Sequence, residues 1–172
     1  MRKLLLLLPA MVLATLAFFG ATASSASAGS IYATGAGWVS FQPFTGKHYW
    51  HFDVSAHSGP QGDQGQVGFT INDPTFPLQS KVALDCVDIF PVLGLNGAAW
   101  VAGTVTKASP QPNFYAITPG TRLEFYFVDG GNPSATPVDE FDPFFEFAPC
   151  DTLGFFGYSP DVTQGNVNIS TG

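Results

Sequence analysis

Four polar side chains alternate along one short segment, and their types could support catalysis or metal binding. They are His51, Asp53, Ser55 and His57. Serine, histidine and aspartate form the catalytic relay of many hydrolases, and histidine is a common metal ligand. Strict alternation indicates a β-strand, in which residues two apart are separated by about 6.6 Å and their side chains are parallel. A relay within one strand is therefore hard to build, and a solvated polar face is the main interpretation.

A second set of candidate ligands is acidic. Seven carboxylates fall in one stretch that contains no Lys or Arg: Glu124, Asp129, Asp139, Glu140, Asp142, Glu146 and Asp151. Carboxylate oxygens beside flexible glycines suit calcium, so we consider Asp129, Asp139 and Asp142 as calcium ligands and calcium as the one candidate cofactor. The stretch does not match an EF-hand, and a solvated acidic loop is the alternative.

Aromatic residues run beside these acids: Phe141, Phe144, Phe145, Phe147, Phe155, Phe156 and Tyr158. Aromatic rings presented on loops can stack on sugars or bind apolar ligands. A high density of phenylalanine is also typical of core packing beneath a long connection. Both interpretations stay open from the sequence.

Cys86 and Cys150 are the two cysteines of the chain. In an oxidising compartment an isolated pair usually forms a disulfide, which here would contribute about 4 kcal/mol. Two free buried thiols are the alternative. A zinc site is disfavoured because no second cysteine or histidine lies at ligand spacing.

Short segments with a period of two must position all of these residues. They cover 49–57, 66–71, 81–89, 98–107, 122–129 and 167–169, and many glycines and prolines separate them. The pattern predicts an all-β fold, a single antiparallel β-sandwich or β-barrel domain of roughly seven to nine strands. It directs Cys86 inward with Val82 and Leu84. Asn96-Gly97 predicts a hairpin turn, and residues 29–37 look like a loose leader.

The N-terminus predicts export. Arg2 and Lys3 precede an apolar run, and a small-residue tract ends in Ala26-Ser27-Ala28. This is the pattern of a secretory signal peptide over residues 1–28, followed by a β-sheet domain over 29–172 with no membrane span. We therefore expect an extracellular or cell-envelope location. The whole chain carries a formal charge of −7, and cleavage would remove two of its basic residues, which argues against nucleic acid as a partner.

Several motifs resemble those of a group of bacterial secreted β-proteins without an assigned activity. That group shows a cysteine-bearing strand, a strand ending in G-x-V/I-T-K, then F-x-V-x-D-N-G, a loop aspartate, a second cysteine and a closing G-N-V-x-V strand. The matching segments here are 84–87, 96–107, 125–132, Asp139, Cys150 and 165–169. One departure is Asp129-Gly130-Gly131 in place of D-N-G. The resemblance implies export, an all-β domain and a Cys86–Cys150 disulfide, and it implies no mechanism.

Three functions are compatible with these features. The first is a non-enzymatic secreted β-domain with a binding or envelope-structural role, whose partner is a carbohydrate, an apolar small molecule or an envelope component. The second is a β-barrel that holds a small apolar ligand in a cavity lined by Phe69, Phe125 and Phe127. The third is a hydrolase-type enzyme that uses the strand of His51 and His57, with carboxylates supplied by another strand.

Overall fold

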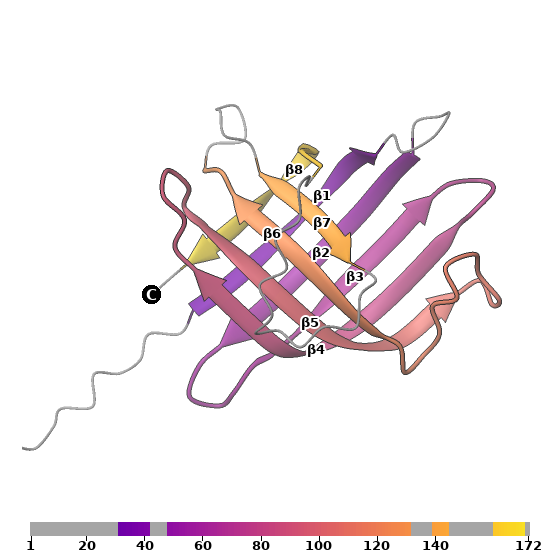
Figure 1. Ribbon diagram of the computed structural model, residues 1–172, viewed down its shortest axis with the longest axis horizontal. Helices are drawn as coiled ribbons and strands as arrows, with labels where there is room; N and C mark the ends of the chain where they lie inside the picture. Colours follow the sequence, from indigo (N-terminus) through magenta and orange to yellow (C-terminus); the bar gives the residue numbers. More distant parts are fainter. Residues whose placement is uncertain (1–30, 42–47, 132–138, 145–159, 171–172) are drawn as a thin grey trace, which may run out of the picture.

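The computed structural model describes residues 31–41, 48–131, 139–144 and 160–170, which form eight β-strands and no helix. The strands are β1 (Ile31–Phe41), β2 (His48–Ser58), β3 (Gln64–Asn72), β4 (Leu78–Phe90), β5 (Gly97–Ser109), β6 (Arg122–Asp129), β7 (Glu140–Phe144) and β8 (Val162–Ser170). They form one antiparallel sheet in the order β7-β6-β5-β4-β3-β2-β1-β8. The predicted all-β antiparallel fold is confirmed (Figure 1).

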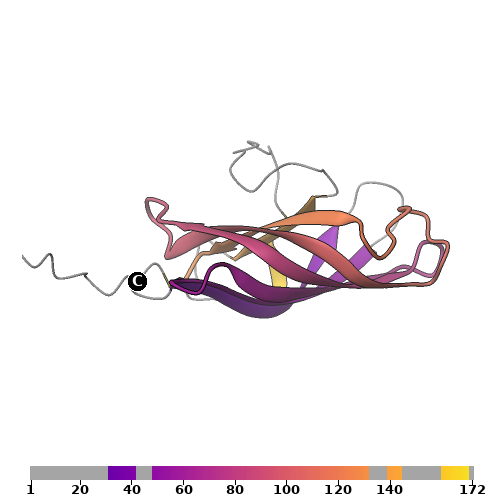
Figure 2. The same cartoon turned by 90° about the horizontal axis from the view of Figure 1, so that it is seen from below.

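The two edges of this sheet meet where β7 and β8 begin. The amide of Val162 donates to the carbonyl oxygen of Asp139 at 2.8 Å, and the amide of Phe141 donates to that of Pro160 at 3.2 Å. In the described residues this contact amounts to a single bridge, between Glu140 and Asp161. The sheet is therefore a nearly closed, flattened barrel (Figure 2). We call the junction of β6 and β7 with β8 the seam.

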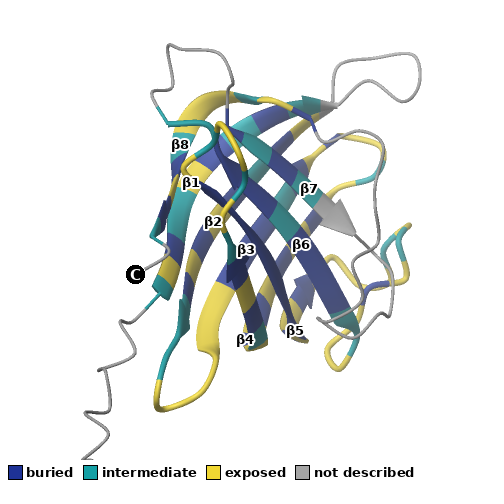
Figure 3. Ribbon diagram, turned by 60° about the vertical axis from the view of Figure 1, so that its left-hand side comes forward, coloured by how far each residue is buried: buried dark blue, intermediate teal, exposed yellow. Residues whose placement is uncertain are grey.

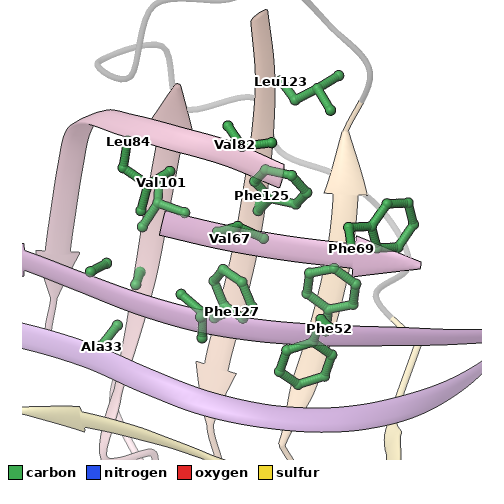
Figure 4. Close-up of a cluster of buried hydrophobic side chains, with 14 of the residues drawn as sticks. Ala33, Phe52, Val67, Phe69, Val82, Leu84, Val101, Leu123, Phe125 and Phe127 are labelled. Carbon is green, nitrogen blue, oxygen red and sulfur yellow. The ribbon is translucent and has the colours of Figure 1, made fainter. Parts of the chain in front are cut away.

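Phenylalanine rings fill the interior of the barrel. Phe141 of β7 is fully buried and contacts the rings of Phe52, Phe69, Phe125 and Phe127. Its centroid lies 4.4 Å from that of Phe52 and 5.1 Å from that of Phe127. Aliphatic side chains from neighbouring strands point into the same core (Figure 4). Aromatic contacts of this kind add to the large apolar area that each ring buries, so the short strand β7 is central to the packing.

The alternation in β2 is observed as predicted. Trp50, Phe52, Val54 and Ala56 are all buried, and the polar residues between them face outward. The predicted β4–β5 hairpin also forms, because Phe90 pairs with Ala98. However, Asn96-Gly97 is not its turn: Gly97 begins β5, and the positive φ of 83° belongs to Gly94.

Two expectations were wrong. Residues 31–37 are not a loose leader but part of β1, which lies between β2 and β8. Cys86 does not point inward with Leu84. The register shifts between Leu84 and Cys86, so that Cys86 pairs with the outward residue Ala102 while Val87 enters the core. This β-bulge reverses the side-chain direction, and Cys86 is half-buried.

Candidate functional site

The polar residues of β2 lie on the outer surface of the barrel. His51 packs against Trp38 of β1, with ring centroids 4.8 Å apart and planes inclined by 60°. In register, Thr70 lies on the other side of His51. His57 lies between Tyr32 and Gln64.

This arrangement bears on the hydrolase hypothesis. The residues paired with His51 and His57 on β1 and β3 are aromatic, hydroxyl or amide residues, and none is a carboxylate. The nearest acid along the chain is Asp53 on the same strand, whose side chain stands parallel to that of His51. The described residues therefore bring no acid from a second strand to either histidine.

The buried acid Asp129 holds three parts of the chain at the seam. Its Oδ1 accepts hydrogen bonds from the side-chain amide of Asn96 at 3.0 Å and from the backbone amide of Gly131 at 2.8 Å. Its Oδ2 accepts the backbone amide of Ile169 in β8 at 2.8 Å. Both oxygens of a side chain that is only 4% exposed are thus occupied.

Asp139 completes the same arrangement from the start of β7. Its Oδ1 accepts the amide of Gly130 at 2.9 Å, and its Oδ2 accepts the amide of Val167 at 2.6 Å. Burial raises the pKa of Asp139 and the charge of Asp129 raises it further, whereas the two amide hydrogen bonds lower it. Asp129 and Asp139 thus accept hydrogen bonds from backbone amides of β8 on the side of that strand that faces away from β1.

Asp142 does not join these two acids. It alternates with the inward-facing Phe141 and pairs with Tyr126, so it lies on the outer face. Burial, and then the nearby charge of Glu140, raise the pKa of Asp142 to about 6. The described residues contain no group of three His, Cys, Asp or Glu side chains arranged to hold a metal ion. Calcium binding by Asp129, Asp139 and Asp142 stays a prediction.

The candidates for an apolar binding cavity are instead part of the packed core. Phe69, Phe125 and Phe127 are at most 1% exposed, and each contacts the ring of Phe141. The core-packing interpretation of the C-terminal aromatics therefore holds for Phe141. Phe145, Phe147, Phe155, Phe156 and Tyr158 lie outside the described residues, as does the side chain of Phe144. Cys150 also lies outside them, so the Cys86–Cys150 disulfide stays a prediction.

The outer surface of the barrel has two unlike halves. On β5 and β6, whose ribbons are largely in the buried colour (Figure 3), some outward-facing residues are nevertheless buried, although Thr104 and Thr106 at the far end of β5 are exposed. Trp100 is 5% exposed and Glu124 is 3% exposed. Trp100 packs against Tyr126 with ring centroids 4.7 Å apart. Burial, and then the charge of Glu140, raise the pKa of the Tyr126 hydroxyl. The wall is therefore closed to solvent around Trp100 and Glu124.

We call the other half, formed by the outward side chains of β8, β1, β2 and β3, the open face. Tyr32 is 44% exposed and Tyr49 is 43% exposed on it. Hydroxyl and amide side chains make up much of the remainder. Asp53 is the only carboxylate in these four strands, and none of them contains Lys or Arg.

Sequence reasoning predicted the polar side of β2 but missed the contribution of β1 to the open face, because it treated residues 29–37 as a loose leader. Tyr32 and Trp38 of that strand were not considered as candidates, although aromatic residues that alternate with small ones are a strand signal. Glycines at positions 35 and 37 hide that signal. A Cβ at Gly35 would lie 3.0 Å from Val167 Cα, and one at Gly37 would lie 3.1 Å from the Phe52 ring. These glycines allow β8 and the core to approach β1 closely.

No protein-family model, curated protein or solved structure matches this chain. Within the described ranges, the chain forms no helix with the length and apolar character that a membrane crossing requires.

Proposed function

We propose that this protein is exported and acts outside the cytoplasm as a non-enzymatic binding domain that uses its open face. One observation carries the proposal: the interior of the described barrel is occupied by phenylalanine rings, whereas Tyr32, Tyr49 and many hydroxyl and amide side chains are accessible on the open face. A binding domain needs such a surface, with aromatic area and unsatisfied polar groups side by side.

The same observation separates this proposal from its two rivals. A barrel that holds an apolar ligand needs unfilled space beside Phe69 and Phe127, and their rings are packed against Phe141. A hydrolase needs an acid and a base from different elements, and the strands beside His51 supply neither. Neither rival gains a supporting contact from the described residues.

Export is supported by the N-terminal sequence and by the resemblance to bacterial secreted β-proteins. Residues 1–28 lie outside the described part, which begins at β1. N-terminal sequencing of protein recovered from the medium or envelope should find Gly29 as the first residue. Recovery of the protein in a membrane fraction with Met1 still attached would contradict export by a cleaved signal.

Binding through the open face is tested with a pair of aromatic variants. Trp38→Ala removes an aromatic residue from the open face, and Phe114→Ala removes one that is 69% exposed on the β5–β6 connection. Purified protein is added to the envelope fraction of the cells that produce it, and the retained amount is measured against concentration. We expect Trp38→Ala to lower retention about tenfold and Phe114→Ala to retain wild-type binding. Equal retention by all three proteins would contradict the use of the open face.

A further inference from the structure

Two lysines face each other on the outer side of β4 and β5, strands that lie side by side (Figure 1). Lys81 of β4 pairs directly with Lys107 of β5, and both are exposed. Within the described part of the chain neither lysine forms an ion pair, whereas Arg122 is paired with Asp85 at 2.8 Å. Like charges directly opposite each other destabilise a sheet, so the fold itself gains nothing from this pair of charges.

A β-bulge brings Lys107 to this position. Val82 pairs with Val105, and the next pair along the strands joins the two lysines, so Thr106 is an extra residue on β5. Alternation from the buried Val105 would direct Lys107 into the core, but the extra residue turns its side chain outward. The Thr106 hydroxyl donates a hydrogen bond to the carbonyl oxygen of Lys81 at 3.2 Å, which ties the bulge to β4.

The two ammonium groups can bind one anionic group together. Cβ atoms of directly opposed residues on neighbouring strands lie about 5 Å apart. A lysine side chain is a flexible stem that ends in three donors. Both ammonium groups can therefore reach the oxygens of a single carboxylate or phosphate, which removes the repulsion between them.

The surroundings of the two lysines favour a sugar polymer as the carrier of that group. On one side Gln79 pairs with Ser109, and Gln79 continues the row to Thr70 on the open face. On the other side Thr104 and Thr106 are exposed. Amide and hydroxyl groups exchange hydrogen bonds with sugar hydroxyls. The chain has a formal charge of −7, so a polymer with closely spaced charges, such as nucleic acid, would be repelled.

Asp53 places one negative charge beside the lysines. Gly68 of β3 lies in register between Asp53 and Lys81 and has no side chain. The Asp53 carboxylate lies over this glycine, because a Cβ added at Gly68 would be 2.7 Å from Asp53 Cγ. It forms no ion pair with Lys81. An anionic ligand on the lysines therefore meets repulsion from the side of β2, and removal of this charge should strengthen its binding.

We propose that Lys81 and Lys107 form a subsite for the acidic group, a carboxylate or a phosphate, of an anionic polysaccharide. This inference rests on the proposed binding function, names its ligand class and extends the binding surface from the open face onto β4 and β5.

The experiment measures the affinity of the exported protein for a polyuronate and for a poly(glycerol phosphate) by affinity electrophoresis and calorimetry, over a range of salt concentrations. A neutral β-glucan and double-stranded DNA are measured for comparison. We expect at least one of the two anionic polymers to bind and its affinity to fall as the salt concentration rises. Which of the two binds distinguishes a carboxylate from a phosphate. Equally tight binding of the neutral glucan, or binding of DNA alone, would overturn the subsite.

Variants locate the binding on the two lysines. Lys81→Gln and Lys107→Gln should each weaken binding about fivefold and reduce its salt dependence, whereas Lys107→Arg should bind like the wild type. Asp53→Asn should strengthen binding about twofold. Melting curves verify that each variant folds.

Arg122→Gln is the matched control, because it changes the net charge by the same amount at a residue that is already paired with Asp85. It should change the affinity by less than about twofold. If Arg122→Gln weakened binding as much as Lys107→Gln, the effect would belong to the net charge of the protein and the subsite would be overturned.

Failure of this inference is distinguishable from failure of the proposed function. If neither anionic polymer binds while Trp38→Ala still reduces retention on the envelope fraction, the ligand class is wrong and the open face remains a binding surface. If neither polymer binds and Trp38→Ala leaves retention unchanged, both proposals are wrong.

Discussion

The seam and the open face both contain carboxylates without a basic partner, but the protein uses them in opposite ways. At the seam, every oxygen of Asp129 and Asp139 accepts a hydrogen bond from an amide. On the open face, the exposed Asp53 accepts none within the described residues. The donors around an acid, and not its membership of an acidic cluster, therefore decide whether its oxygens are used within the fold.

Replacing a seam carboxylate should give the largest effect on stability. Asp139→Ala leaves the amides of Gly130 and Val167 without their acceptor in a buried region. An unsatisfied buried amide costs about 1–3 kcal/mol, so we expect the free energy of unfolding in urea to fall by about 3 kcal/mol. Asp53→Ala is the matched control and should change it by less than about 0.5 kcal/mol. If Asp139→Ala and Asp53→Ala lowered the free energy of unfolding equally, the difference between the seam and the open face would be contradicted.

The sequence predicted most strands but not the seam. Alternation in β2 and β6 is a local property, so the inward positions of Phe52 and Phe125 were visible in it. The acceptor role of Asp129 depends on Ile169, which lies far along the chain and is brought near only by closure of the barrel. The bulge before Cys86 has no local signal, because Asp85 alternates correctly until the pairing with β5 shifts.

The predicted Cys86–Cys150 disulfide involves the outer side of the barrel wall at β4, β5 and β6. Cys86 faces that side after the bulge, in register with the buried residues Ala102 and Glu124. If Cys86 is bonded to Cys150, Cys86→Ser should lower the free energy of unfolding by about 2–4 kcal/mol. Cys150→Ser should lower it equally, and the double variant should add little. Two reactive thiols in the denatured, unreduced protein would show that the bond is absent.

The pH dependence of the free energy of unfolding tests the raised pKa of Asp142 on the outer face of β7. The folded-state pKa of Asp142 is about 6, above its ordinary value of 3.8, so the folded protein binds this proton more tightly than the unfolded chain. The stabilisation is therefore fully present below pH 3.8 and is lost progressively as the pH rises to and through 6. Because the side chain is half-exposed, we expect a loss on the order of 1 kcal/mol between pH 5 and 7.5.

Asp142→Asn supplies the control for this pH dependence. The variant should be the more stable protein at pH 7.5 and should lose most of the dependence, whereas Asp88→Asn should retain it. The raised pKa of Asp139 acts in the same direction, so a smaller dependence should persist in Asp142→Asn. Stability that instead rises between pH 5 and 7.5 would contradict the assigned environment of Asp142.

Added calcium is expected to have the smallest specific effect, measured on the melting temperature. The sequence predicts a calcium-specific rise in melting temperature, but the structure places Asp142 on the other face of the wall from Asp129 and Asp139, and no three acids of the described residues are grouped to hold a metal ion. We therefore expect calcium chloride and sodium chloride at equal ionic strength to shift the melting temperature alike. A larger rise in melting temperature with calcium than with sodium, abolished by Asp129→Asn, would instead support the predicted calcium site.

The measurement that tests the central claim most directly is native mass spectrometry of the protein recovered from its own culture medium, made as wild type, Trp38→Ala and Phe114→Ala. An open-face binding domain should carry its ligand in the wild type and in Phe114→Ala, and Trp38→Ala should be empty. A ligand retained by Trp38→Ala until the protein unfolds would place it inside the barrel and would contradict binding through the open face.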